Sequence, residues 1–176
     1  LSVARGSASA GAIRMVFSRF IPIQGFGSGI GLQVGAGYLF HLGLFGVIFF
    51  AAPHVDFLNS EFLGFGWTVM PHWAFVVTSQ MAFFGLLALW IHRRVNRVSR
   101  LISTPGDHIG SILTFGVMLT GCMSLAQSFD ELRLLHRFSV ELFLIYFPFS
   151  SLMHAFTFIP SRAYTGAWFA RRGIKP

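Results

Sequence analysis

The chain has 176 residues, of which 54% are hydrophobic and only 11% are charged. An average soluble domain carries roughly 25% charged residues, so a surface this poor in charge cannot face water on all sides. The single cysteine, Cys122, excludes an internal disulfide and a multi-cysteine metal site. We therefore expect a membrane protein rather than a soluble enzyme, and any iron–sulfur cluster that serves it must belong to another chain.

Four apolar stretches are long enough to cross a hydrocarbon core of about 30 Å, which requires roughly 20 residues. Because backbone polar groups must be paired within lipid, we expect each stretch to be a helix and the fold to be an all-α, four-helix transmembrane bundle. Pro53 and Pro160 are expected to close the first and fourth helices, and Thr104 and Pro105 to begin the third. The four predicted spans are 34–53, 70–91, 109–128 and 136–159.

The predicted bundle occupies residues 34–160, between an N-terminal segment at 1–33 and a cytoplasmic tail at 161–176. In the N-terminal segment, Arg5, Arg14 and Arg19 alternate with apolar side chains, which favours a cytoplasmic or interfacial amphipathic segment. The segment has no apolar core of the length that a signal peptide requires. Since the chain begins with Leu1, we expect it to be processed or a fragment.

The net charge of +7 could suggest nucleic acid, but the basic residues lie between the apolar runs, which is typical of membrane topology. Eleven of the thirteen Lys and Arg residues belong to the two ends of the chain and the loop at 92–108. The positive-inside rule then places both termini on the cytoplasmic side of a multi-pass protein of the cell's inner membrane, with no nucleic-acid partner.

Ionisable groups at membrane depth are expensive and usually functional, and a neutral imidazole is a common axial ligand of haem iron. His92 and His108 fall in the basic loop and are expected to be solvated. The remaining five histidines lie within or at the ends of the predicted spans: His41, His54, His72, His136 and His154.

His136 and His154 are 18 residues apart on one predicted helix, which is five whole turns and about 27 Å. Both would project from one face, one near each surface of the bilayer, as two haems on a common helix require. His41 would face His154, and either His54 or His72 would face His136. The alternative is that these histidines are packed and bonded to neighbouring backbone or hydroxyl groups.

Three segments resemble the haem b membrane subunit, the gamma subunit, of respiratory nitrate reductase. The resemblance covers about residues 37–160 and extends to relatives in sulfite-reduction-associated and heterodisulfide-reductase-like complexes. The segments are LFHLGLFG at 39–46, RVSRLIST at 97–104 and, most specific, RFSVELFLIYFPFSSLMH at 137–154.

The resemblance implies that His41 and His154 ligate the haem nearer the cytoplasm and that His136 ligates the outer haem. The family's fourth ligand would fall at Ala51, so His54, or alternatively His72, must replace it if there are two haem b groups rather than one. A lysine of the family's quinone site corresponds to Gln80 here, which implies an altered or displaced quinone pocket.

The expected function is electron exchange between the quinone pool and an iron–sulfur partner subunit, with the catalytic subunits of the complex on the cytoplasmic face. Glu141 is a candidate proton acceptor for quinone chemistry. Arg97, Arg100 and Arg137 could pair with haem propionates or could merely satisfy the topology rule. The rival interpretations are a haem-free membrane anchor, a transporter, and the cytochrome b of formate dehydrogenases or hydrogenases.

Overall fold

The computed structural model describes residues 4–21, 27–126 and 129–174, and within these ranges the chain is helical, with no β-strand. The chain divides into two compact units. The terminal unit comprises Leu1–Ile30 and Pro148–Pro176, and the core unit comprises Gly31–Phe147. The prediction of an all-α protein is confirmed.

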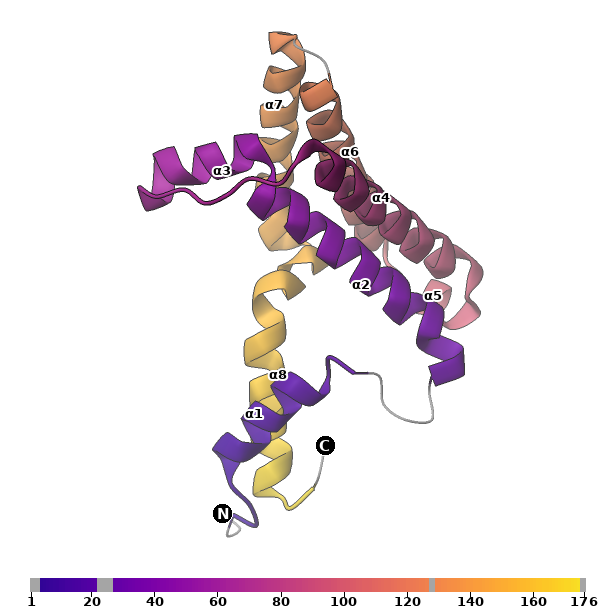
Figure 1. Cartoon of the computed structure of the whole chain (residues 1–176). Coiled ribbons are helices and arrows are strands. Elements are labelled where there is room, and N and C mark those ends of the chain that lie inside the picture. The colour runs from indigo at the N-terminus through magenta and orange to yellow at the C-terminus, as the bar shows by residue number, and fades with distance from the viewer. Residues whose placement is uncertain (1–3, 22–26, 127–128, 175–176) are drawn as a thin grey trace. The chain divides into compact units, whose positions relative to one another are not determined.

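Three helices are long and apolar enough to cross a membrane (Figure 1). They are α2 (Gly27–Phe50), α4 (His72–Val95) and α6 (Pro105–Ala126), which match the first three predicted spans. At the start of α6, the Asp107 carboxylate accepts hydrogen bonds from the backbone N–H and the hydroxyl of Thr104, at 2.9 and 3.0 Å. The predicted start of the third helix is therefore confirmed.

The fourth predicted span is not one continuous helix, and that prediction is wrong. Helix α7 (Asp130–Tyr146) gives way to two 3-10 turns (Phe147–Phe149 and Ser151–Met153), and α8 (His154–Arg171) follows. Pro148 has no backbone N–H for the helix and its ring clashes with the preceding turn, while the Ser150 side chain caps the next turn by accepting from Leu152 N–H at 3.2 Å. The two helices around this break would together supply a fourth candidate span.

The break also removes the geometric basis for placing His136 and His154 on one helix face, because the two residues belong to α7 and α8. Pro160 does not end the last helix either, since α8 continues through it to Arg171. An internal proline removes one backbone hydrogen bond, a loss that helices in lipid commonly tolerate.

Helices α2 and α4 approach closely because small residues line their contact. A Cβ atom at Gly43 would lie 2.5 Å from the backbone of Thr78 and Ala82, and one at Gly85 would overlap the backbone of Phe40. Small residues at such positions let helix backbones pack directly in a membrane, where the hydrophobic effect does not hold helices together.

After α2 the chain makes a short excursion before returning as α4. Ala51 is extended, α3 (Ala52–Leu58) begins with Pro53 in its first turn, and a π-helical turn ends at Gly64, whose φ of 71° suits glycine. The returning segment satisfies the last carbonyl groups of α2, because Trp67 Nε1–H and Met70 N–H donate to the carbonyls of Phe49 and Phe50 at 2.6 and 2.8 Å.

The remaining helices of the core unit pack in sequence. Phe83 of α4 meets Phe115 of α6 with ring centroids 5.1 Å apart, and Tyr146 of α7 donates to the Gly106 carbonyl of α6 at 2.9 Å. The short helix α5 (Arg97–Ile102), capped by Asn96, connects α4 to α6.

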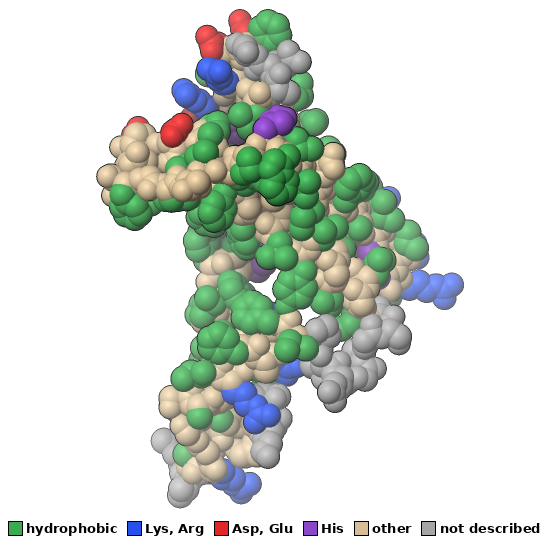
Figure 2. Space-filling model, in the orientation of Figure 1, with side chains coloured by type: hydrophobic (Ala, Val, Ile, Leu, Met, Phe, Trp, Pro, Cys, Tyr) green, Lys and Arg blue, Asp and Glu red, His purple; other side chains and the backbone are tan. Residues whose placement is uncertain are grey.

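Large apolar side chains remain exposed on the core helices, and hydrophobic groups cover much of the visible surface in Figure 2. Leu42, Phe84 and Ile112 are each more than 60% exposed. Water would oppose the exposure of such large apolar surfaces, whereas lipid chains would cover them. The exposure therefore agrees with the membrane-protein prediction.

In the terminal unit, α1 (Ala8–Ser18) packs antiparallel against α8. Gly11 and Gly166 meet backbone to backbone, and Met15 is buried beside them. The Arg162 guanidinium lies over the rings of Phe20 and Phe158, at 5.2 and 5.4 Å from their centroids. Residues 161–171, predicted to be a tail, are thus part of a packed helix pair.

Candidate functional site

The main feature of the core unit is a histidine pair. His54 in α3 and His136 in α7 have ring centroids 6.3 Å apart, with ring planes inclined by only 29°. Both residues are half-buried. Because α2 ends before His54, this residue lies on the separate short helix α3. The direction of its side chain therefore does not have to follow the helical periodicity of α2, and it can contact His136.

The hydrogen bond of His54 shows which of its two ring nitrogens carries the hydrogen. His54 Nδ1 lies 3.0 Å from the Val47 carbonyl oxygen, which can only accept, so Nδ1 carries the hydrogen. A neutral imidazole that donates through Nδ1 keeps its lone pair on Nε2. In its neutral form, His54 therefore carries its lone pair on Nε2.

A polar cluster on α6 and α7 surrounds the second ring. Ser139 Oγ donates to the His136 carbonyl at 2.7 Å, and Thr120 Oγ1 lies 3.0 Å from the Val117 carbonyl and 2.9 Å from Ser139 Oγ. Thr120 Oγ1 also lies within hydrogen-bonding distance of His136 Nδ1, at 3.1 Å. The Val117 carbonyl is a further hydrogen-bond partner of the His136 ring.

Gly121 lies directly against the His136 ring. A Cβ atom at this position would lie 3.0 Å from Cε1 of the imidazole. No sequence pattern marks Thr120, Gly121 or Ser139 as site residues, because small and hydroxyl residues are common where membrane helices pack and carry no distinctive spacing.

A cavity of about 560 Å³ lies between the start of α3, α4 and α6. Two of its lining residues, Ala51 and Ala52, shortly precede His54 in the sequence, and a third, Cys122, follows Gly121. Its polar lining residues are His72, Ser79, Gln80 and Cys122, and the Ser79 hydroxyl and the Cys122 thiol are hydrogen-bond partners. His72, the alternative ligand, therefore lines the cavity, whereas His54 is the residue beside His136.

The other two predicted ligands belong to different units. His41, in α2, is half-buried and its Nδ1 lies 2.7 Å from the Gly37 carbonyl. His154, at the start of α8, has its Nδ1 2.8 Å from the Ser151 carbonyl. Both rings thus show the same Nδ1-to-carbonyl orientation as His54. Their pairing with one another stays a prediction.

The remaining predicted site residues lie on the surface of the chain. Arg97, Arg100, Arg137 and Glu141 are exposed, so Glu141 is not the buried carboxylate that the sequence suggested. Their roles toward propionates and protons stay predictions. Within the described ranges, no group of three or more His, Cys, Asp or Glu side chains is placed to hold a metal ion.

Comparisons with known proteins add one relative. No family model and no solved structure matches the chain. A protein of Nitratidesulfovibrio vulgaris (strain Hildenborough), described only as a protein, is 30% identical over 139 residues, which is 77% of this chain. The chain spans 61% of that relative's length.

Proposed function

We propose that the chain is a haem b membrane subunit of a respiratory oxidoreductase complex, related to the gamma subunit of nitrate reductase. It would exchange electrons between the quinone pool and an iron–sulfur partner docked on the basic cytoplasmic face. The observation that carries this proposal is the His54–His136 pair, whose members come from helices that are far apart in the sequence and whose rings are each held by a hydrogen bond at Nδ1.

His54 and His136 are the two residues that would hold a haem b in the core unit. Their rings have centroids 6.3 Å apart and lie nearly parallel. A bis-histidine haem takes only two ligands from the protein, so it does not require a group of three or more metal-binding side chains.

A bound haem b would supply one-electron redox chemistry at this position. The chain's own residues would orient the two imidazoles: the Val47 carbonyl holds His54, and Thr120 holds His136. Such outer hydrogen bonds fix the tautomer and raise the basicity of the ligating nitrogen. Gly121 would leave the His136 ring free of a neighbouring side chain on one side.

Replacing Thr120 by Val tests the outer hydrogen bond. The substitution keeps the shape but removes the hydroxyl partner of His136 Nδ1, so we expect haem affinity to fall by about 10- to 100-fold. The rate of haem transfer to apomyoglobin measures this change. Thr165→Val on α8, whose hydroxyl donates to the Ser161 carbonyl, is the matched control. Equal transfer rates in both variants would contradict the assigned role of Thr120.

The adjacent cavity is the proposed quinone site. Its volume suits a quinone ring, its walls are mainly apolar, and Ser79, Gln80 and His72 supply the few polar groups that would orient the ring carbonyls. Gln80 stands where the related subunit has a lysine, so an amide N–H would donate to the quinone where the family uses an ammonium group.

Replacing Gln80 by Leu tests the cavity. We expect the rate of haem reduction by a water-soluble quinol analogue to fall three- to tenfold, because one hydrogen bond to the substrate is lost. The haem content should not change. Gln33→Leu, an exposed position on α2, is the matched control. A quinol reaction that is equally fast in all three proteins would place the quinone elsewhere.

The second candidate function is a haem-free membrane anchor, in which the histidines only form the hydrogen bonds described above. Reduced-minus-oxidised absorbance spectra of the purified chain separate the two functions, because only the cytochrome has the bands of haem b.

In the proposed cytochrome, His41 and His154 would hold a second haem nearer the cytoplasm, and both termini would face the cytoplasm.

A further inference from the structure

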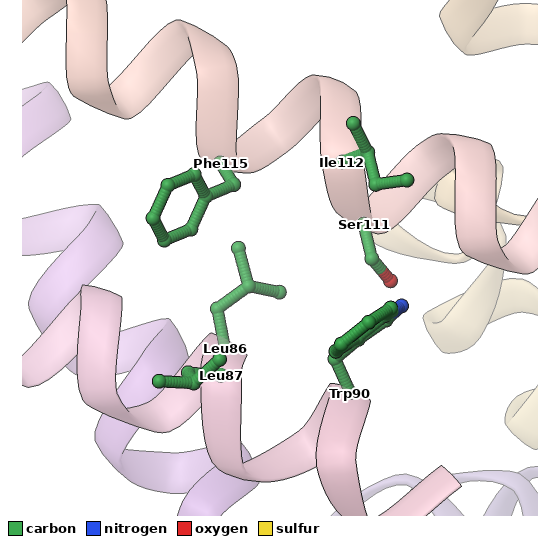
Figure 3. Close-up of a pocket in the computed structure, with 6 residues that line it drawn as sticks. All are labelled: Leu86, Leu87, Trp90, Ser111, Ile112 and Phe115. Carbon is green, nitrogen blue, oxygen red and sulfur yellow. The ribbon is translucent and has the colours of Figure 1, made fainter. Parts of the chain in front are cut away.

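A second, smaller cavity lies at the opposite end of α4 from His72, where the helix approaches its basic C-terminal turn. It has a volume of about 210 Å³ and lies between α4 and α6. Figure 3 shows the lining side chains around the hollow, with the indole nitrogen of Trp90 directed toward the Ser111 side of the cavity. The lining residues are Leu86, Leu87, Trp90, Ser111, Ile112 and Phe115.

Two polar atoms at this place have no hydrogen-bond partner among the described residues. Trp90 Nε1 and His108 Nδ1 are both buried, and the two rings meet edge to face with centroids 6.5 Å apart. An indole N–H can only donate, and no residue in the described part of the chain supplies the acceptor oxygen that it requires. A buried polar atom left unpaired is costly, and two of them together indicate an occupant that completes their hydrogen bonds.

Charged groups lie near the same corner. The Arg94 guanidinium lies over the Trp90 ring, 5.9 Å from its centroid. Arg93 is paired with Asp107 at 3.4 Å, and Asp107 directly precedes His108 in the first turn of α6.

We propose that this cavity binds one anionic phospholipid of the bilayer. The apolar walls from Leu86 to Phe115 would hold the upper part of an acyl chain, and an ester carbonyl would accept from Trp90 Nε1–H. The phosphate would lie against Arg94 and His108. Basic pockets between transmembrane helices are known to suit such headgroups, and tryptophan is enriched at the depth of the ester groups. The site is independent of the proposed haem and quinone sites.

Native mass spectrometry of the full chain, extracted from nanodiscs containing phosphatidylglycerol and phosphatidylcholine, tests this proposal. We expect one retained phosphatidylglycerol per chain. Retention should fall about threefold in Trp90→Phe, which loses one neutral hydrogen bond, and about tenfold in Arg94→Gln, which loses a charged one. Trp73→Phe and Arg14→Gln are matched controls, because both positions are exposed and remote in sequence from the cavity.

Three outcomes would overturn the proposal. The variants could retain as much lipid as the controls, phosphatidylcholine could be retained equally well, or added quinone could displace the lipid and show that the cavity binds a quinone ring. Far-UV circular dichroism of each variant confirms that it is folded, so that lost lipid is not mistaken for lost structure. Arg94→Lys should recover most of the retention, because it restores the charge.

Discussion

Replacing His54 by Ala is expected to remove one haem b per polypeptide, while replacing His72 by Ala leaves the haem content unchanged. The sequence favours His54 and leaves His72 as the alternative, and in the structure His54 lies beside His136, with ring centroids 6.3 Å apart, while His72 lines the 560 Å³ cavity. Loss of an axial ligand leaves the iron with a single protein ligand, and a haem held in this way dissociates readily. The pyridine haemochrome assay on purified protein measures the change.

His136→Ala should give the same loss as His54→Ala, since the two residues are proposed to hold the same iron. Added imidazole should restore part of the haem in either variant, which separates a lost ligand from a misfolded protein. If His72→Ala loses the haem and His54→Ala keeps it, the proposed ligand pair is wrong. In that case the 6.3 Å contact would be a packing contact.

Replacing Gly85 by Ala is expected to destabilise the core unit strongly. A Cβ atom there would overlap the backbone of Phe40 and lie 2.8 Å from the Ala36 carbonyl oxygen, so α2 and α4 would have to move apart. Overpacking of a tight contact costs about 1–3 kcal/mol, and here backbone atoms, not flexible side chains, must give way. Unfolding in mixed detergent micelles, followed by circular dichroism, measures the loss.

Gly116→Ala is the matched control, because a Cβ atom at Gly116 meets nothing within 4 Å. That substitution should be neutral or should stabilise α6 by about 0.5–1 kcal/mol, since alanine is the better helix former. Equal stabilities of the Gly85 and Gly116 variants would mean that α2 and α4 do not pack as described. The comparison does not depend on haem, so it tests the fold separately from the function.

The three helices long and apolar enough to cross a membrane could be predicted from the sequence, because the bilayer sets the length and apolar content of such helices. The start of α6 was equally predictable, since Thr104, Pro105 and Asp107 act locally. The prediction of one continuous fourth helix was wrong because its apolar residues continue through Pro148. Composition alone does not show that the backbone changes from α-helix to 3-10 turns there.

The residues of the candidate site, too, could be predicted only in part from the sequence. His54 and His136 were identified because charged or titratable residues are rare in apolar segments. The choice between His54 and His72 could not be made from the sequence, since it depends on the short helix α3 and on where α4 begins. Thr120 and Ser139 were missed because only the contact between α6 and α7 brings their hydroxyls to the imidazole.

The pyridine haemochrome assay on the purified wild-type chain, with a protein determination, tests the central claim most directly. We expect about two haem b groups per polypeptide, one held by His54 and His136 and one by His41 and His154. A chain without haem would contradict the proposed cytochrome function and would leave a membrane anchor. A single haem that survives in His136→Ala but is lost in His154→Ala would contradict the outer pair.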